Sequence, residues 1–506
     1  MDIKKIERHF PIIIFFISLI FFSALLWYLR RAGMLGIDDA YITFRYAENL
    51  ARGKGFVYNS GERVLGTTTP VFCLLLAFLR LLKIPVLLSA DLLNVFSSAL
   101  SASLIYLIGR ELKNKVLGGV VVLLYILFPH FWMNLTTGME TMFTVFLCLL
   151  LVWLDLKGKP MLLGIVGGLL LLTRIDALAL VASVFIIRFF KAPKQAIFIS
   201  AIILLTILPW LIFSFFYFDS IIPQSILAKK LIHPLSAVLV LKKYLIWFVG
   251  LKEEGAGLNF SFPHLIVYSF FSLLGVVRVM VKERWALVFI LWILFFLAGM
   301  AIGESGPFFW YKVPMLSGYI FLVGMGLQWF CSFWERVSLR MTLSFYVFIP
   351  LALILWGLSN YPYDDFIRGF TEKEKANQRL ARIIKQNFPD SSKILAGETG
   401  IIGYELLDYY LIDSAGLCSQ KVYELRLKDR QKLLALSKNF KWDWWGTIDW
   451  VIETINYYQP EFILSDIRYI YLKKVISAPA FSYHYQIVAQ ESTSESEILL
   501  LQRMEK

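Results

Sequence analysis

The chain has few charged residues and few of the side chains that build metal sites or disulfide frameworks. Of its 506 residues, 17% are charged and 58% are hydrophobic, whereas a soluble protein carries about a quarter charged residues. Its four cysteines and five histidines are scattered, without the spacing of a disulfide framework or a zinc site. No glycine-rich phosphate loop with a following lysine occurs. These absences argue against a soluble enzyme built around a nucleotide, a zinc ion or a disulfide scaffold.

Long apolar runs contain most of the hydrophobic residues. A run of about 20 apolar residues can cross the hydrocarbon core of a bilayer as a helix. The first run, residues 10–28, is too long for the core of a signal peptide and lacks a small-residue cleavage site. The pattern predicts a polytopic α-helical membrane protein with about eleven spans, near residues 10–30, 88–109, 116–132, 141–156, 160–172, 177–190, 195–217, 261–280, 285–302, 313–333 and 341–358.

Basic residues set the orientation of these spans. Lys4, Lys5 and Arg8 precede the first span, which predicts a cytoplasmic N-terminus because positively charged loops stay on the cytoplasmic side. The other basic loops then fall inside, provided that the runs 70–82 and 233–250 lie in the outer interface, in contact with membrane lipids. Topology thus accounts for much of the net charge of +13, so no nucleic-acid partner is expected. The prediction is a multi-pass protein of the cytoplasmic (inner) membrane.

The composition changes near residue 360. Residues 1–359 form the predicted transmembrane module, with a first outer loop over residues 31–87, and residues 360–506 form a predicted extracytoplasmic soluble α/β domain. Its size is that of an ordinary small domain. The patterns predict strands near residues 392–397, 410–413, 461–465, 484–489 and 498–501, and helices near 428–436 and 448–457.

The first outer loop contains the strongest local signal. Asp38 and Asp39 lie at the predicted membrane border, ahead of a short segment with apolar residues at helical spacing. One acid at the start of a helix can be a cap that accepts bonds from free N–H groups. Capping leaves the second acid unexplained, so the pair is predicted to be catalytic or to bind a metal.

Other polar and aromatic residues lie at the predicted outer ends of spans, where ionisable groups are costly and therefore suggest function. Carboxylates and cations on one face suit a reaction between a hydroxyl and a lipid-borne phosphate, because a carboxylate can take the proton while cations stabilise the departing phosphate. The candidates are Arg45, Glu140, Arg174, Asp176, Lys229, Lys230, Glu304, Trp310, Tyr311 and Lys312.

Each of these has a structural alternative. Arg174 and Asp176 could form a salt bridge that braces two short spans. Lys229 and Lys230 could be lysines that reach the headgroup level. The aromatic pair Trp310–Tyr311 could be an interfacial anchor.

The first loop, DDAYITFRYAENLARGKGFVYNSGERVLGTTTP, resembles the opening outer loop of GT-C glycosyltransferases, most of all the terminal arabinofuranosyltransferases of cell-wall arabinan synthesis. TTGMET, LLTRIDALAL, DSIIPQSILAKK and GETGIIGYELLDYYLIDSAGL match the same pattern in the same order. The chain departs from it at Leu65, where an acid is expected, at the threonine run 67–69, and at Glu398, a position that is more often Asp.

The resemblance implies a polyprenyl-phosphate-linked sugar donor, in the nearest case a pentofuranose, and transfer to an envelope glycan, lipid or protein outside the membrane. It places the catalytic acid at Asp38 or Asp39, of which we prefer Asp38. It makes Arg45 and Lys229 candidates for the donor phosphate, joined by Lys230, Arg174 and Lys312. Glu140, Asp176, Trp310 and Tyr311 are assigned to the acceptor or the second outer loop.

A metal is optional in this interpretation. The second outer loop has one acid and no Asp-x-Asp, so an obligatory cation is not implied. Oxygen ligands from Asp38, Asp39 and Glu140 could hold Mg²⁺, Mn²⁺ or Ca²⁺. Two other functions stay open: a transporter or flippase of lipid-linked sugars, which would need polar residues at mid-membrane, and a non-catalytic scaffold that binds envelope glycans.

Overall fold

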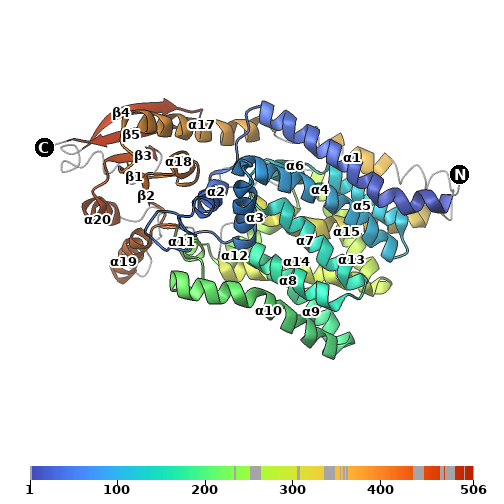
Figure 1. Cartoon of the computed structure of the whole chain (residues 1–506). Coiled ribbons are helices and arrows are strands. Elements are labelled where there is room, and N and C mark those ends of the chain that lie inside the picture. The colour runs from blue at the N-terminus through green and yellow to red at the C-terminus, as the bar shows by residue number, and fades with distance from the viewer. Residues whose placement is uncertain are drawn as a thin grey trace.

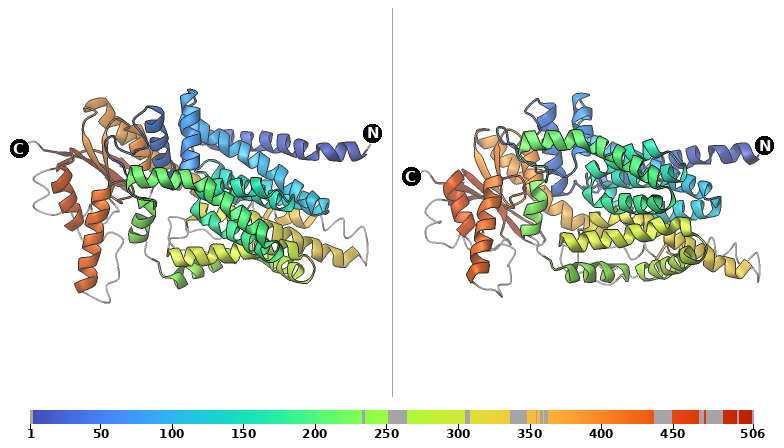
Figure 2. Two further views of the ribbon diagram at one scale, coloured as in Figure 1. Left: turned by 60° about the horizontal axis from the view of Figure 1, so that its bottom comes forward. Right: turned by 90° about the horizontal axis from the view of Figure 1, so that it is seen from below.

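The computed structural model describes residues 3–232, 235–250, 264–304, 308–335, 348–353, 355–356, 359, 363–436, 449–467, 472, 485–494 and 496–504. Apolar helices form the larger part, and a small sheet domain lies at the end opposite the N-terminus (Figures 1 and 2). The predicted span over residues 341–358 lies largely outside the described residues.

Five helices are long and apolar enough to cross a membrane among the described residues. They are all or most of α1 (Ile3–Arg31), α4 (Val86–Glu111), α10 (Pro193–Phe218), α14 (Leu287–Gly303) and α15 (Phe309–Glu335). A helix of 26 residues, such as α10, is about 39 Å long, which exceeds a hydrocarbon core of about 30 Å.

Two bent helix pairs raise the number of possible spans to seven. α5 (Lys115–Leu127) and α6 (Pro129–Leu135) meet at 54°, and α11 (Gln224–Ile232) and α12 (Ala237–Phe248) meet at 88°. The first bend falls at Pro129, whose ring and missing N–H favour a new helix start. The remaining apolar helices are shorter, so the count of about eleven spans stays a prediction. These shorter apolar helices are α3 (Pro70–Leu81), α7 (Thr141–Leu156), α8 (Pro160–Thr173) and α13 (His264–Val281), and α9 (Leu178–Lys191) is short as well.

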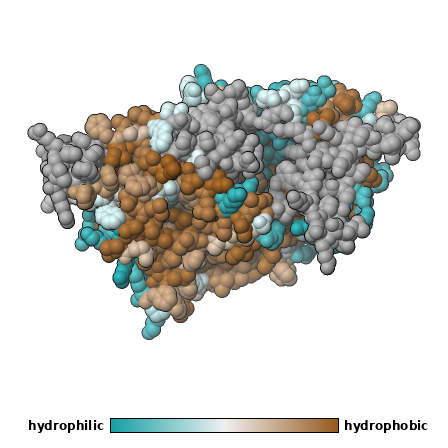
Figure 3. Space-filling model, turned by 180° about the vertical axis from the view of Figure 1, so that it is seen from behind, coloured by the Kyte–Doolittle hydropathy of each residue, from teal (hydrophilic) through white to brown (hydrophobic). Residues whose placement is uncertain are grey.

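The helical part exposes apolar side chains over a broad area (Figure 3). Helix α10 packs on α8 and α9, but Leu205 and Phe216 on its other sides remain 62% and 76% exposed. Such a surface is unfavourable in water and suits the lipid phase. The chain is therefore an α-helical membrane protein, as its sequence predicts.

Two short helices of the predicted first outer loop lie between the apolar helices and the sheet domain (Figure 1). They are α2 (Asp38–Ala51) and α3 (Pro70–Leu81). The buried carboxylate of Glu48 on α2 accepts a hydrogen bond from Arg80 Nε on α3 at 2.8 Å. Because α3 has 12 residues, it is about 18 Å long and too short to cross the membrane, which fits the predicted interface helix.

The C-terminal sheet has five strands in the order β2-β1-β3-β5-β4. All five predicted strands are present: β1 (Lys393–Ala396), β2 (Tyr410–Asp413), β3 (Phe462–Asp466), β4 (Tyr485–Ser492) and β5 (Glu497–Arg503). β1 is parallel to β2 and β3, and β5 is antiparallel to β3 and β4. The helices of this domain are α17 (Tyr363–Asn387), α18 (Gly400–Glu405), α19 (Gln420–Leu436) and α20 (Asp449–Tyr458).

Candidate active site at the junction of the two parts

Asp38 joins the predicted first outer loop to the sheet domain. It opens α2, but its carboxylate caps another helix: Oδ2 accepts from the backbone N–H of Gly400 at 2.9 Å, and Oδ1 from that of Ile401 at 2.8 Å. These N–H groups begin α18, whose first turn follows β1. A side chain at position 400 would collide with Asp38, because a Cβ there would lie 1.7 Å from its carbonyl oxygen. Glycine is thus required for this close approach.

Acidic neighbours surround this carboxylate. Burial, followed by the charge of Glu398, raises the pKa of Asp38 from 3.8 to about 8, although the two N–H bonds favour the charged form. The backbone N–H of Asp38 also bonds to Glu374 of α17, whose own pKa is raised by burial and by Asp38. Glu398 forms an ion pair with Lys373. Asp38 is therefore fixed in place, and its raised pKa of about 8 is close to the range that suits a general base.

Asp39 faces a different partner. Its Oδ2 accepts a hydrogen bond from Lys229 Nζ of α11 at 2.7 Å, and both side chains keep about a quarter of their surface exposed (24% and 22%). The Lys229 ammonium also lies 5.3 Å from the centre of the Phe308 ring. The two adjacent acids thus have separate surroundings, one at α18 and one at a lysine that solvent or a ligand can reach.

Arg174 is the centre of a second charged group at the ends of α7 and α8. It donates from Nε and one terminal nitrogen to Asp176, and from the other terminal nitrogen to Glu140, each at 2.9 Å. The guanidinium lies 5.1 Å from the Tyr311 ring, and Tyr311 is within electrostatic reach of Lys229 as well. Tyr311 therefore connects the two charged groups into one network. The salt bridge foreseen between Arg174 and Asp176 is present, with Glu140 as a third member.

Arg45 has a structural position. It is 1% exposed, and its guanidinium donates to the carbonyl oxygens of Tyr58, Gly403, Leu406 and Tyr409 and to Asn59 Oδ1. These bonds occupy the N–H donors of the guanidinium, which would otherwise be available to bind a phosphate. In this arrangement Arg45 fastens α2 to the loop between α18 and β2.

The remaining predicted residues lie around this network. Lys230 pairs with Glu304 at 3.4 Å on the exposed surface. Lys312 is buried, and its ammonium lies over the rings of Tyr244 and Trp247 of α12. Trp310 is buried too and stacks on Phe308 with 4.8 Å between ring centres, so it does not sit at the surface as an interfacial anchor would.

The carboxylates do not converge on a metal position. Asp38 is bonded to the N–H groups of α18, Asp39 to Lys229, and Glu140 to Arg174. Within the described part of the chain, no group of three or more His, Cys, Asp or Glu side chains is placed to hold a metal ion. These residues therefore do not fit the optional divalent cation.

Two parts of the site were not assigned from the sequence. Glu374 lies in an amphipathic helix with many charged residues and has no distinguishing motif. The turn from Glu398 to Ile401 had a usable signal, because it is a glycine-rich turn at the carboxyl end of the parallel strand β1, where ligand sites of α/β sheets form.

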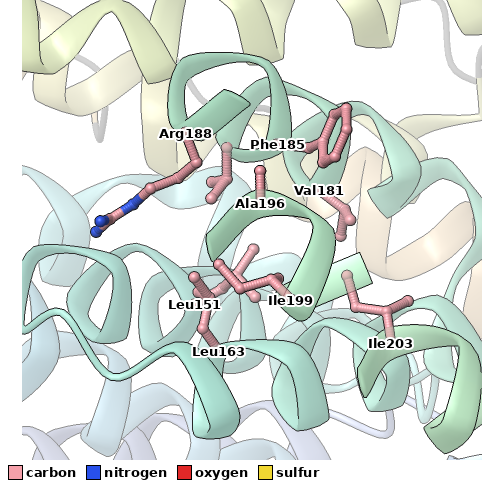
Figure 4. A pocket seen from close by; sticks show the side chains of 9 residues that line it. Leu151, Leu163, Val181, Phe185, Arg188, Ala196, Ile199 and Ile203 are labelled. Atoms are coloured by element: carbon pink, nitrogen blue, oxygen red, sulfur yellow. The ribbon is translucent and has the colours of Figure 1, made fainter. Parts of the chain in front are cut away.

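A small pocket elsewhere does not have the features of a reaction site. It lies among α7, α8, α9 and α10 and is lined mainly by apolar side chains such as Leu163 and Ile199 (Figure 4). Arg188, at its edge, points its guanidinium away from these residues and pairs with Asp155 at 2.5 Å. We interpret this pocket as a packing gap.

The whole chain is similar to solved membrane-protein structures. ArnT from Cupriavidus metallidurans, bound to undecaprenyl phosphate, aligns with a TM-score of 0.56 and 12% identity over 97% of each chain. The oligosaccharyltransferase of Archaeoglobus fulgidus in its apo form aligns with a TM-score of 0.59 and 11% identity, over 95% of this chain and 74% of that chain. The chain therefore shares the overall fold of these membrane proteins.

Further comparisons agree with this fold and add little about activity. Archaeal AglB from Archaeoglobus fulgidus, in complex with an inhibitory peptide and a dolichol-phosphate, aligns with a TM-score of 0.55 and 11% identity, over 97% of this chain and 74% of that chain. A family described as a domain of unknown function, DUF8728, matches residues 365–498, which include most of the sheet domain. No curated protein matches the sequence.

Proposed function

We propose that the chain is an integral-membrane glycosyltransferase that moves a sugar from a polyprenyl-phosphate donor to an acceptor outside the membrane. The observation that carries the proposal is the pair Asp38–Asp39, in which the first acid is held by two N–H groups of α18 with its pKa raised to about 8, and its neighbour pairs with the partly exposed Lys229. ArnT and AglB, which share the fold, are described in complex with undecaprenyl phosphate and dolichol-phosphate. This supports a lipid phosphate as the leaving group here.

In the proposed reaction, Asp38 takes the proton from the acceptor hydroxyl. The acceptor oxygen then forms a bond to the anomeric carbon, and the bond from that carbon to the phosphate oxygen breaks. The phosphate leaves with the electron pair and its charge is stabilised by Lys229. Each oxygen of Asp38 accepts one N–H bond, and a carboxylate has further lone pairs for the acceptor.

The other residues support these two. Asp39 positions Lys229, and Tyr311 with Arg174 extends the cationic side of the site towards Glu140 and Asp176. We leave Arg45 out of the phosphate site because its donors bond within the protein. Lys230 is also left out, because it pairs with Glu304 away from Asp39. We keep the pentofuranose donor and the envelope glycan, lipid or protein acceptor as proposals that rest on the first-loop resemblance.

The decisive experiment gives the purified protein a panel of polyprenyl-phosphate sugars and measures the product and the released polyprenyl phosphate. Lys229→Gln is expected to raise KM for the donor about tenfold or more, because a charge-assisted bond to the phosphate is lost. Lys230→Gln on the same helix is the matched control and should leave KM within about twofold. Equal effects of the two substitutions, or no transfer from any donor by the native protein, would contradict the proposal.

The proposed orientation places the site and the sheet domain outside the cytoplasmic membrane, with the N-terminus inside. All four native cysteines are buried, so they give a low labelling background. We expect an introduced Asp408→Cys, at a position whose side chain is half exposed, to react with a membrane-impermeant maleimide in intact cells. Lys159→Cys, at an exposed position that the proposed orientation puts on the cytoplasmic side, should react only after permeabilisation. The reverse pattern would overturn the orientation.

A further inference from the structure

The sheet domain contains an open groove of about 630 Å³ at the start of α19 and the end of α20. Binding pockets for small ligands commonly measure about 300–1,000 Å³. Three tyrosines line the groove: Tyr410 at the edge strand β2, and Tyr457 and Tyr458 at the end of α20. Tyr457 is 62% exposed. Its ring packs edge to face against the Tyr458 ring, with 4.8 Å between the ring centres. A large, exposed aromatic ring in a polar groove is a ready surface for stacking.

The charged side chains of the groove balance one another. The lining includes two acids, Glu62 and Glu424, and two bases, Lys393 and Lys421. Lys421 lies 3.9 Å from Glu424 and 5.2 Å from the centre of the Tyr457 ring. With two acids and two bases, the groove has no net attraction for a phosphate or a polyanion. Its carboxylates and ammonium groups can still bond to hydroxyl groups.

Glu62, from the predicted first outer loop, is one of the residues that line this groove. The Tyr410 hydroxyl donates to Glu62 Oε1, and Asn59 Nδ2 donates to Glu62 Oε2 at 3.2 Å. The Asn59 side chain also accepts a hydrogen bond from the N–H of Leu411 at 3.1 Å and donates one to its C=O at 2.8 Å. A neighbouring strand would make the same two bonds. The groove therefore belongs to the same loop that carries the acid pair.

We propose that this groove binds an uncharged oligosaccharide, as a docking site for the non-reacting part of a glycan acceptor. Sugar rings pack their C–H faces on tyrosine and bond through hydroxyl groups to carboxylates and ammonium groups, which is the combination present here. The open side of the groove allows a longer chain to continue beyond it. The binding itself is independent of the proposed transfer reaction, whereas the acceptor role rests on it.

The test measures binding of short arabinan, galactan and maltose-type oligosaccharides to the purified full chain by calorimetry. Tyr457→Ala and Glu424→Ala are expected to weaken the best ligand about three- to tenfold each, or about 0.7–1.4 kcal/mol, because the first removes the stacking surface and the second a partner for sugar hydroxyl groups. Ile452→Ala, on the same helix and 41% exposed, is the matched control and should not change binding.

The outcomes separate the two proposals. Binding that Tyr457→Ala weakens supports the groove even if the chain transfers no sugar, in which case the proposed reaction fails alone. The groove assignment is overturned if no neutral oligosaccharide binds the native chain, if Ile452→Ala weakens binding as much as Tyr457→Ala, or if an anionic glycan binds more tightly than its neutral counterpart. A raised KM for a long acceptor with unchanged kcat in Tyr457→Ala would establish the acceptor role.

Discussion

Asp38→Asn is expected to lower the rate of sugar transfer about 10²- to 10⁴-fold, the range for removal of a general base. The substitution keeps the size of the side chain but cannot accept a proton at the reacting oxygen. Asp39→Asn is expected to act mainly through Lys229, and so to raise KM for the donor more than it lowers kcat. Both are measured as initial rates with a polyprenyl-phosphate sugar and a glycan acceptor.

The pH profile gives an independent readout of the same residue. Because the pKa of Asp38 is raised to about 8, kcat/KM should rise with pH as this carboxyl loses its proton, and should level off above about pH 8. Asp38→Asn should remove this limb of the profile. A native profile without such a limb, or one that Asp38→Asn leaves in place, would assign the base to another residue.

Asp38 also supports the fold, so the activity loss needs a control for stability. Replacing one acceptor oxygen by an amide leaves an N–H of α18 without its partner, at a cost of about 1–3 kcal/mol. Asp413 is the matched control, since its carboxylate accepts from the N–H groups of Ala415 and Cys418, both at 2.8 Å. Asp413→Asn should lower the melting temperature comparably, while the folded fraction keeps its activity.

The raised pKa of Asp38 also makes the stability of the folded chain depend on pH. The folded chain holds a proton on Asp38 that the unfolded chain releases above an ordinary pKa of 3.8. This contribution to stability is therefore present at low pH and declines as pH rises to about 8, beyond which it is lost. The melting temperature of the native protein should therefore fall relative to that of Asp38→Asn, which has no such proton to lose, as pH rises from about 4 to 8.

Local patterns predicted much of the fold. The apolar runs marked the helices, and alternation with turn residues marked all five strands of the sheet domain. The number of spans stays a prediction, because α8 is as apolar as a span but shorter, and the bent pair α5–α6 can count as one span. Hydropathy measures composition, whereas a span also requires an unbroken helix of sufficient length.

The acid pair was visible in the sequence, but the division of its roles was not. Asp38 and Asp39 are neighbours in the chain, and only the packing of α2 shows that one meets α18 and the other meets Lys229. Arg45 illustrates the same limit. An arginine that binds backbone carbonyls some 360 residues away has the same local sequence context as one that binds a phosphate, because neither partner is encoded nearby.

The second large effect is expected from Gly400→Ala. Its Cβ would lie 1.7 Å from the Asp38 carbonyl oxygen, a backbone atom that cannot turn aside as a side chain can. The turn at the start of α18 must therefore move away from α2, which breaks the N–H bonds to the Asp38 carboxylate. We expect a loss of stability at or above the upper end of the usual 1–3 kcal/mol for overpacking.

This substitution tests whether the sheet domain takes part in the reaction. If Asp38 is held in its reactive position by α18, Gly400→Ala should reduce kcat in the fraction of protein that remains folded, although position 400 contributes no reacting group. Gly299→Ala, in α14 with no heavy atom within 4 Å of the added Cβ, is the matched control and should leave both melting temperature and kcat near native values. A destabilised Gly400→Ala protein with native kcat would show that the transmembrane module orients Asp38 without the sheet domain.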